Sequence, residues 1–354
     1  MNAPTSKKEF GVFLPIANGG WIISKNAPRL DASYKQNREA AILADDIGLD
    51  FIMSMMKWRG FGGETEHWGT SLESVTMMAG IAEVTKNARI IATVHTLLQN
   101  PAVVAKMITT LDHISGGRAG LNIVSGAYKD EFDQMGAWPE LDHDGRYRYA
   151  EEWTKLVTTM WNKDHVDYEG EFFNFKDCVS EPKPLSSPRP YLICAGQSER
   201  GLRFTVQNTD ACFIGGKDAA DTLRISRLAH RVASEYNATI KVFAMSTVVF
   251  GETDEEAART VAYYKEGLDW GAVQGMMRSY GMEADGRPAI MGENAKDTFM
   301  THTVFGTPET CLEKLKAQIE GCELDGVMLI FPDYVKGLSI MGAEVLPQLK
   351  AHFA

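Results

Sequence analysis

Short apolar runs and longer amphipathic stretches alternate along almost the whole chain. The runs that have the length and composition of strands cover residues 10–16, 51–55, 89–97, 119–124, 191–195, 211–214, 242–250 and 327–331. The stretches with apolar residues at helical spacing cover residues 33–48, 71–85, 101–115, 149–161, 199–207, 219–236, 254–266 and 308–320. Strands that alternate with helices in this way predict a parallel sheet covered by helices.

Three of the expected helices carry recognisable start signals. Thr70 with Glu73, and Thr253 with Glu256, match the capping box, in which two groups satisfy free N–H donors of the first turn reciprocally. Thr307 stands directly before a proline, which combines a capping side chain with the residue that helices favour at their first position. These signals support the helix assignments independently of the apolar pattern.

Eight strand–helix units favour a closed (β/α)8 barrel. An open, doubly wound sheet shows the same alternation, but its dinucleotide-binding form carries a G-x-G-x-x-G turn after the first strand. No such turn follows the first strand of this sequence. We therefore predict an α/β fold with a single TIM-barrel domain over residues 1–354 and insertions in the loops that follow strands.

Two segments interrupt the alternation and are expected to be insertions. Residues 166–173 predict a small hairpin that turns at Glu169 and Gly170. Residues 266–300 contain methionines, glycines and Trp270 without strand character. Two interpretations fit this second segment: a lid over the top of the barrel, or a plain helical connection on the surface.

Composition and charge argue against several classes of function. The formal net charge is −11 and no block of Lys and Arg occurs, so a nucleic-acid partner is not expected. The five cysteines include no C-x-x-C pair, which argues against a disulfide framework and against a zinc site. The start of the chain has no apolar signal core, and no apolar run reaches about 18 residues. We therefore expect a cytoplasmic protein without a membrane partner.

The loops that follow strands should carry the chemistry, because active sites of barrels lie at the carboxyl ends of the strands. The chain contains no H-E-x-x-H, G-x-S-x-G or P-loop motif, and its histidines are too scattered to predict a catalytic metal. The acidic pairs at 45–46 and 151–152 fall in expected helices, where a solvated face is the simplest explanation. The amides, hydroxyls and few cations that remain suit a planar heteroaromatic cofactor with a phosphate tail.

A phosphate site is indicated where the strand at 191–195 passes into a helix. Gly196 and Ser198 stand at this junction, and backbone N–H groups at a helix start can bind an anion. Arg146 and Tyr147 can add charge-assisted hydrogen bonds. A strand–glycine–helix junction more often has a purely structural role, so the residues alone leave both interpretations open.

Several longer motifs make the sequence recognisable. They are GVFLPI at 11–16 with Gly20 and Trp21, SMMKWRGFGG at 54–63, SGGR at 115–118 leading to Asn122, Glu131 with QMG at 134–136, Trp138 with Pro139, and ICAGQS at 193–198. In these motifs the chain resembles the bacterial luciferase-like flavin-dependent monooxygenases over nearly its whole length. Within that family it is most similar to the pyrimidine monooxygenases that open the uracil ring.

The resemblance implies a luciferase-like (β/α)8 barrel that uses reduced FMN and dioxygen. A separate NAD(P)H-dependent flavin reductase would supply the reduced FMN, and homodimers or homotetramers are usual in the family. The family's FMN contacts fall on Met56, Lys57, Asn122, Glu131, Arg146, Tyr147 and Ser198. The catalytic residues that steer dioxygen fall on Thr93 and Asn122. The implied reaction passes through a flavin peroxide, which attacks a carbonyl carbon of a cyclic amide or N-heterocycle with cleavage of a C–N bond.

Some residues of the expected substrate pocket depart from the uracil-opening pattern. Residues 125–128 read Ser-Gly-Ala-Tyr and lack the large tryptophan of that pattern, and the loop after the third strand also differs. We therefore expect a roomier pocket that takes a larger cyclic amide or a fused N-heterocycle. The residues expected to contact the substrate are Trp21, Phe61, His95 and Tyr128. His95 shares an inward face with Thr93 at a spacing of two, but it could equally be a packed histidine.

Other functions remain compatible with the sequence. Alkanesulfonate and sulfone monooxygenases of the same family grip an anionic substrate with Arg and His on the seventh strand, and residues 242–247 contain neither. A lyase-type enzyme that acts on a larger ring such as a flavin, a deazaflavin-dependent oxidoreductase, and a non-catalytic flavin-binding protein also fit the barrel. The presence of Thr93 and Asn122 favours dioxygen chemistry over the last two. Because no NADH fingerprint is visible, we do not expect the chain to oxidise NADH efficiently by itself.

Overall fold

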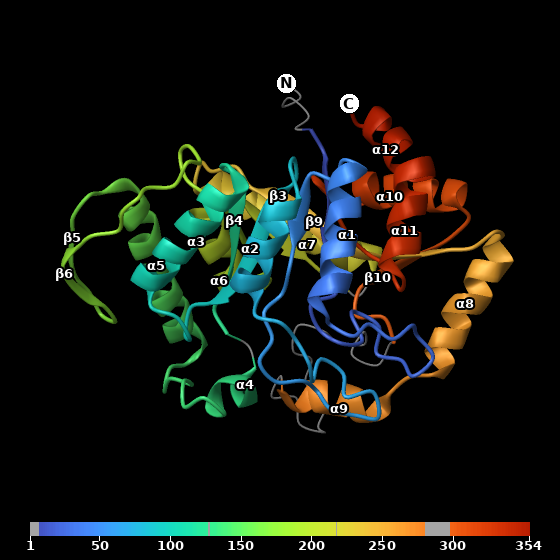
Figure 1. Cartoon of the computed structure of the whole chain (residues 1–354), viewed down its shortest axis with the longest axis horizontal. Coiled ribbons are helices and arrows are strands. Elements are labelled where there is room, and N and C mark those ends of the chain that lie inside the picture. The colour runs from blue at the N-terminus through green and yellow to red at the C-terminus, as the bar shows by residue number, and fades with distance from the viewer. Residues whose placement is uncertain (1–6, 127, 217, 280–297) are drawn as a thin grey trace.

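Eight parallel strands close into a barrel in the computed structural model (Figure 1), which describes residues 7–126, 128–216, 218–279 and 298–354. In hydrogen-bonding order the strands are β11 (Gly326–Ile330), β1 (Glu9–Phe13), β2 (Phe51–Met53), β3 (Arg89–His95), β4 (Ala119–Val124), β7 (Tyr191–Cys194), β8 (Ala211–Ile214) and β9 (Lys241–Phe250). Strand β9 pairs with both β8 and β11, which closes the ring. All of these pairs are parallel, so the predicted TIM barrel is confirmed.

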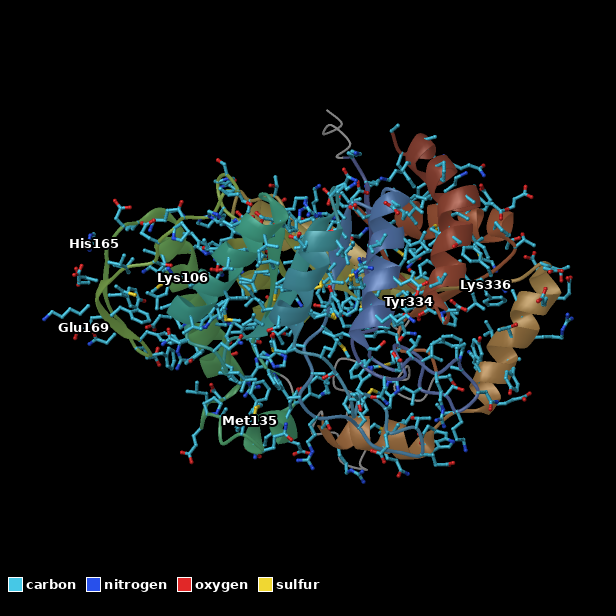
Figure 2. The ribbon with its side chains drawn as sticks, viewed as in Figure 1. Lys106, Met135, His165, Glu169, Tyr334 and Lys336 are labelled. Atoms are coloured by element: carbon cyan, nitrogen blue, oxygen red, sulfur yellow. The ribbon has the colours of Figure 1, made fainter. Side chains whose placement is uncertain are left out.

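Helices surround the barrel and return the chain from one strand to the next (Figure 1). They are α1 (Tyr34–Asp46), α2 (Ser74–Val84), α3 (Pro101–Ser115), α5 (His143–Asn162), α6 (Glu199–Asn208), α7 (Ala219–Glu235), α8 (Asp254–Glu266) and α10 (Pro308–Gly321). The last segment comprises α11 (Tyr334–Ile340), a π-helix (Met341–Val345) and α12 (Leu346–His352), which the sequence analysis did not predict. Tyr334, labelled in Figure 2, donates from its hydroxyl to the carbonyl of Phe13 at 2.6 Å and so ties α11 to the end of β1.

One of the predicted helix starts is wrong. The N-cap of α2 is Glu73 itself, whose carboxylate accepts the N–H groups of Val75 and Thr76. Thr70 instead accepts the N–H of Asn18 with its carbonyl, so residue 70 belongs to a loop pairing and the helix begins later. The caps at Thr253 on α8 and Thr307 on α10 are confirmed, because both side chains accept an N–H of the first turn.

The segment after α8 contains a strand that the sequence analysis missed. Strand β10 (His302–Gly306) pairs in parallel with the second half of β9, of which Ser246 and Thr247 also pair with β11. Before it, the described part of the insertion forms α9 (Trp270–Ser279), and residues 280–297 of that insertion lie outside the described residues. Helix α9 packs tightly on the loop after β2, because a Cβ on Gly275 would come within 1.8 Å of the Phe61 carbonyl.

The predicted hairpin is present but longer than expected. It consists of β5 (Val166–Glu169) and β6 (Asn174–Cys178), so its turn includes the residues between them rather than two positions alone. Both strands lie at the left edge of Figure 1, and His165 and Glu169 lie at the outer margin of the molecule in Figure 2. The hairpin is therefore far from the strand ends that form the barrel mouth.

The prediction that the acidic pair at 45–46 forms a solvated face is wrong for Asp45. Its side chain is buried, and its carboxylate accepts the N–H groups of Lys86 at 2.7 Å and Asn87 at 2.8 Å. Burial alone would raise the pKa of Asp45, but hydrogen bonds from the backbone hold it below its usual value. The carboxylate thus fixes the end of α1 to the turn before β3.

Charged side chains seal the end of the barrel at which the strands begin. Glu9 Oε2 lies 3.1 Å from Arg89 Nη1, Lys241 pairs with the other carboxylate oxygen, and Arg89 stacks 3.9 Å from the centre of the Tyr191 ring. Burial alone would raise the pKa of Glu9, but the hydrogen bond and charge of Lys241 together with Arg89 lower it. The opposite end, where the strands finish, is the one at which barrels place their active sites.

Candidate active site

Three segments cover the carboxyl ends of the strands. They are the loop of residues 54–72 after β2, the short helix α4 (Lys129–Asp133) after β4, and α9. Helices α4 and α9 contact each other and lie side by side at the bottom of Figure 1. Residues from the first two segments, together with the last residues of β3 and β4, form the candidate site.

A buried ion pair joins the loop after β2 to α4. Lys57 Nζ lies 3.4 Å from Glu131 Oε2, and the two side chains are 2% and 1% exposed. Glu131 also accepts the backbone N–H of Trp58. Burial lowers the pKa of Lys57 to about 8, although the carboxylate acts in the opposite direction, and burial raises the pKa of Glu131 against the pull of Lys57. As an ion pair, Lys57 and Glu131 contribute no net charge to the site.

Aromatic rings enclose the ammonium group of Lys57. It lies 3.7 Å from the centre of the Tyr128 ring and 4.6 Å from the centre of the Phe61 ring. Trp68 packs 5.0 Å from Phe61 and edge-on to Trp21 at 5.2 Å. Cation–π contacts of this kind stabilise a charge that has little contact with water. The structure therefore brings three of the four predicted substrate-contact residues into one aromatic wall, formed by Trp21, Phe61, Trp68 and Tyr128.

The two residues predicted to steer dioxygen are hydrogen-bonded to each other. Asn122 Nδ2 donates to Thr93 Oγ1 at 2.9 Å, between directly paired positions of β3 and β4. The Thr93 hydroxyl in turn donates to the carbonyl of Ser54, so its proton is already used within the protein. Asn122 Oδ1 is buried and has no hydrogen-bond partner among the described residues. Asn122 is thus the member of the pair that still has polar capacity for a ligand.

Two buried histidines lie near Lys57, and both are uncharged at neutral pH. Burial and the charge of Lys57 lower the pKa of His95 to about 3. Burial, opposed by Asp269 and aided by Lys57, lowers the pKa of His67 to about 4. His95, the fourth predicted substrate contact, stacks on Phe132 of α4 with ring centres 5.1 Å apart. His67, which was not predicted, packs behind the aromatic wall.

Hydroxyl groups gather at the predicted phosphate site, where α6 begins. Ser198 caps this helix by accepting the N–H of Gly201 at 3.0 Å. Burial raises the pKa of Tyr147, and the side chains of Ser125, at the end of β4, and of Ser198 act in the opposite direction, so these hydroxyl groups lie near one another. A Cβ on Gly201 would come within 2.5 Å of the Tyr147 hydroxyl, so glycine at this position allows that approach. The cluster joins three elements at a helix start, which is a favourable place for an anion.

Arg146 and Met56 are connected to the other predicted residues less directly. Arg146 donates to the carbonyl of Leu141 at 3.0 Å, and its guanidinium lies 5.0 Å from the centre of the Trp138 ring. It follows Asp142, the N-cap of α5, by one helical turn and precedes Tyr147 in the chain. Met56 is 5% exposed and belongs to the hydrophobic core. Arg146 and Met56 therefore lie beside the site only as chain neighbours of Tyr147 and Lys57.

These groups fit reduced FMN. A phosphate tail needs N–H and O–H donors near positive charge; the start of α6 and Tyr147 provide such donors, and Arg146 precedes Tyr147 on α5. A flavin ring needs a mostly apolar wall with a few oriented polar groups, which the aromatic wall and the unpartnered oxygen of Asn122 provide. Among the described residues, no three His, Cys, Asp or Glu side chains are grouped so as to hold a metal ion.

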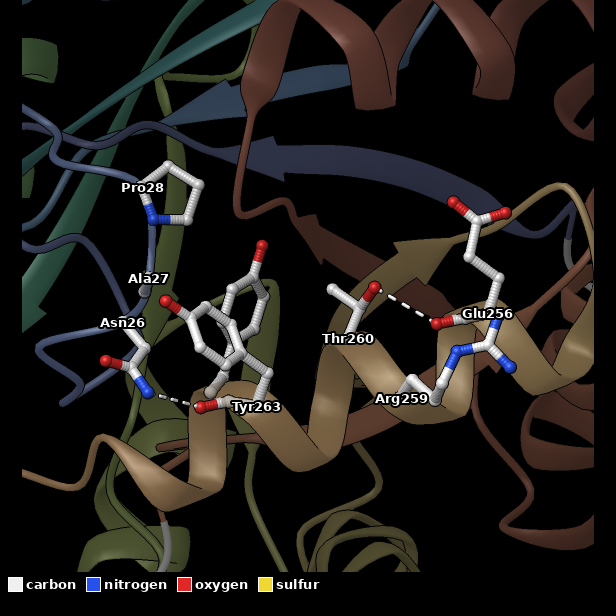
Figure 3. Close-up of a pocket in the computed structure, with 8 residues that line it drawn as sticks. Asn26, Ala27, Pro28, Glu256, Arg259, Thr260 and Tyr263 are labelled. Atoms are coloured by element: carbon white, nitrogen blue, oxygen red, sulfur yellow. Dashed lines mark hydrogen bonds between the residues drawn. The ribbon is translucent and has the colours of Figure 1, made fainter.

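A separate hollow of about 450 Å³ lies between α8 and residues 26–28 (Figure 3). Asn26 donates to the carbonyl of Tyr263 at 2.8 Å, and Thr260 donates to that of Glu256 at 3.1 Å. Of the two hydrogen bonds drawn in Figure 3, the first joins the loop to the helix and the second lies within the helix. None of the predicted site residues lines this hollow.

The protein-family model described as luciferase-like monooxygenase matches residues 8–322. The chain belongs to the luciferase-like monooxygenase family. Members are flavin-dependent monooxygenases, and the family uses reduced FMN. The chain is 37% identical to a protein named pyrimidine monooxygenase RutA from Methylobacterium radiotolerans, over 98% of this chain and 93% of that protein.

Solved structures share the fold of this luciferase-like chain at lower identity. One is a riboflavin lyase, RcaE, solved with modified FMN and riboflavin: the TM-score is 0.85 and the identity 20%, over 98% of this chain and 92% of that one. Another is the long-chain alkane monooxygenase LadA, with a TM-score of 0.85 and 19% identity over the same shares. Likeness at this identity supports the barrel alone. In the part of this luciferase-like chain that the structure describes, no helix is long and apolar enough to cross a membrane.

Several site residues of this family member were missed by reasoning from the sequence. Trp68 and His67 complete the packing around Phe61, and Phe132 supports His95 from α4. The sequence does indicate His67 and Trp68, because two adjacent aromatic side chains in a loop rich in glycine and charge are more stable when packed than when exposed to water. No pattern marked Phe132, whose neighbour His95 lies on another element.

Proposed function

We propose that this luciferase-like protein is a monooxygenase, dependent on reduced FMN and dioxygen, that attacks a carbonyl carbon of a cyclic amide or N-heterocycle and cleaves a C–N bond. The observation that carries the proposal is the hydrogen-bonded pair of Thr93 and Asn122, with a buried oxygen of Asn122 left without a partner. The 37% identity to a protein named pyrimidine monooxygenase supports the substrate class.

The cofactor-binding residues we propose are those that line the two ends of the site. Ser198, Tyr147 and Arg146 would hold the phosphate tail at the start of α6, where hydroxyl groups lie beside a helix start. Met56, Lys57, Glu131 and Asn122 would border the ring. Reduced FMN, when bound, supplies the electrons that activate dioxygen.

Asn122 and Thr93 would have different roles in the reaction. The second N–H of the Asn122 amide would donate to oxygen as negative charge develops, and one such preorganised donor is typically worth about 3 kcal/mol in the transition state. Thr93 would act as a positioning residue, because its hydroxyl accepts from Asn122 and donates to Ser54. The aromatic wall would keep bulk water away from the reacting atoms.

The charges of the site favour an uncharged substrate over a sulfonate. The ammonium of Lys57 is already paired with Glu131 at 3.4 Å. On β9, Met245 and Thr247 alternate in phase with Phe243, whose ring packs 5.2 Å from that of Phe51, so these positions face inward without charge. The Thr247 hydroxyl is hydrogen-bonded to Thr301 at 2.7 Å. We propose Trp21, Phe61, His95 and Tyr128 as the residues that contact the substrate.

The remaining parts of the proposal concern the protein's organisation and partners. A separate NAD(P)H-dependent flavin reductase would supply reduced FMN, and the barrel would work as a single domain in a homodimer or homotetramer. The insertion at 266–300 would act as a lid, for which the packing of α9 on the loop after β2 is the support.

A product screen with isotopically labelled dioxygen tests the proposal. The chain is combined with a flavin reductase, NADH and FMN, and offered uracil, its benzo-fused homologue, barbiturate, riboflavin and alkanesulfonates in turn. We expect one labelled oxygen in a ring-opened product of a cyclic amide, and little NADH consumption without the reductase. Turnover of a sulfonate alone, or activity only with a deazaflavin, would contradict the proposal.

A further inference from the structure

His95 lies on the inner face of the barrel at the point where β3 ends. It follows Thr93 by two positions, so the two side chains face the same way, and its strand position pairs with Val124 of β4. The residue is 4% exposed, and its ring packs against that of Phe132 at an angle of 30°. Its place is therefore next to the hydrogen-bonded pair of Thr93 and Asn122, on the mouth side.

One nitrogen of this imidazole has no use within the protein. Nδ1 of His95 is buried and has no hydrogen-bond partner among the described residues. Buried polar groups are nearly always paired, because an unpaired one loses its hydrogen bonds to water without replacement. Stacking on Phe132 does not require a histidine, since an apolar ring of similar size would pack there without that loss. The unpaired nitrogen therefore points to a ligand.

The charge state of His95 restricts what that ligand can be. Burial and the nearby ammonium of Lys57 keep the imidazole neutral at physiological pH, so it offers one N–H donor and one acceptor lone pair. Lys57 is itself balanced by Glu131. The Lys57–Glu131 pair offers no excess positive charge that would stabilise a ligand with a full negative charge. A cationic ligand would be repelled by the ammonium group of Lys57.

We propose that His95 is a specificity-determining residue that contacts the substrate and selects an uncharged ring with a hydrogen-bonding edge over the same ring carrying an acid group. This inference rests on the proposed function, since it assumes a heterocyclic substrate at this mouth. Beyond that function, the protein would distinguish the uncharged ring from the acid-bearing ring by their charge and by the neutral donor and acceptor that His95 offers on β3.

Binding to the oxidised FMN form tests the inference without turnover. Calorimetry with uracil and its benzo-fused homologue as uncharged probes, and with orotate as the acid-bearing probe, is run on the wild type, His95→Leu and His95→Gln. We expect the wild type to bind the better uncharged probe at least about tenfold more tightly than orotate. His95→Leu should weaken that binding by about tenfold or more, since it leaves the polar edge unpaired, whereas His95→Gln, a neutral donor and acceptor, should stay within about threefold.

His113 of α3 provides a control outside the site. It is exposed, and its Nε2 lies 2.9 Å from the carbonyl oxygen of Lys183. His113→Gln should leave probe binding within about twofold. Nitrogen NMR of the histidine rings gives a second readout in the unmodified chain, in which the His95 signals should shift on addition of the probe even if a variant folds poorly.

Three results would overturn the inference. They are tighter binding of orotate than of either uncharged probe, unchanged binding in His95→Leu together with unshifted His95 signals, and no binding of any uncharged probe by the wild type. Failure of the proposed function would look different. The probes would bind and shift His95, but no labelled oxygen would enter a product in the reductase-coupled assay.

Discussion

Replacing His67 by phenylalanine is expected to make the stability of the protein less sensitive to acid. The imidazole is fully buried, with its ring 6.4 Å from that of Phe61 at 12° and 5.3 Å from that of Trp68 at 25°. Both of its nitrogens are without hydrogen-bond partners among the described residues. A phenyl ring can occupy the same place between the two aromatic neighbours and has no polar atom to leave unpaired.

The direction and size of the effect follow from proton binding. Burial lowers the pKa of His67 from 6.5 to about 4 in the folded protein. Between these two pH values the unfolded chain binds a proton that the folded chain does not, so stability is lost as the pH falls. This linkage removes about 2 kcal/mol of unfolding free energy between about pH 7.5 and about pH 5. His67→Phe should therefore lose about 2 kcal/mol less than the wild type over that interval.

Urea unfolding at the two pH values, followed by tryptophan fluorescence and checked by refolding, measures this difference. The exposed histidine of α3 provides a control, since His113→Gln should behave like the wild type. His95 has a similarly lowered pKa and will add its own acid sensitivity to every sample, so only the difference between variants is informative. Equal losses in His67→Phe and the wild type would refute the reasoning, because they would mean that the buried imidazole is protonated as readily as a free one.

Three further predictions concern the site and its support. Asn122→Ala should keep FMN affinity within about tenfold by fluorescence titration while product formation falls by about 10²–10³-fold; equal losses of both would make Asn122 a cofactor ligand only. Glu131→Gln should lower the unfolding free energy by about 3 kcal/mol, because Lys57 loses its buried counter-charge, and adding Lys57→Met should restore much of it; a double variant no more stable than the single one would contradict this. Arg118→Met should lower the unfolding free energy by about 3 kcal/mol in chemical denaturation, because the guanidinium donates to backbone carbonyls at the end of α2 and before β3. The FMN affinity should stay unchanged, and a loss of FMN affinity would place Arg118 in the site.

The barrel could be predicted from the sequence because its elements are marked by local periodicity. All eight barrel strands are short apolar runs, and most helices between them have an apolar stripe. Strand β10 was missed because it pairs on one edge only and is half exposed, so its residues do not form an apolar run. The start of α2 was misplaced because a loop contact of Thr70 outweighed the local capping pattern.

The site could be predicted only in part, and for a different reason. Lys57 and Glu131 are separated by 74 residues in the chain, so their pairing is tertiary and was suggested by resemblance rather than by spacing. The sequence also could not distinguish the roles of Thr93 and Asn122. The Thr93 hydroxyl donates to the carbonyl of Ser54, and this contact joins the ends of two different strands. The neutrality of His95 depends on burial beneath Phe132, which no local pattern reveals.

The closure of the barrel between its first and last strands has a consequence for biosynthesis. Strand β1 pairs with β11, and the Tyr334 hydroxyl that holds the end of β1 binds a carbonyl 321 residues earlier in the chain. At a ribosomal rate of about 5–20 residues per second, one edge of β1 stays without its partner for tens of seconds. An open strand edge is a template for association with other chains. Nascent chains of this protein should therefore depend on chaperones until β11 emerges, and fragments that stop before residue 326 should aggregate when expressed alone.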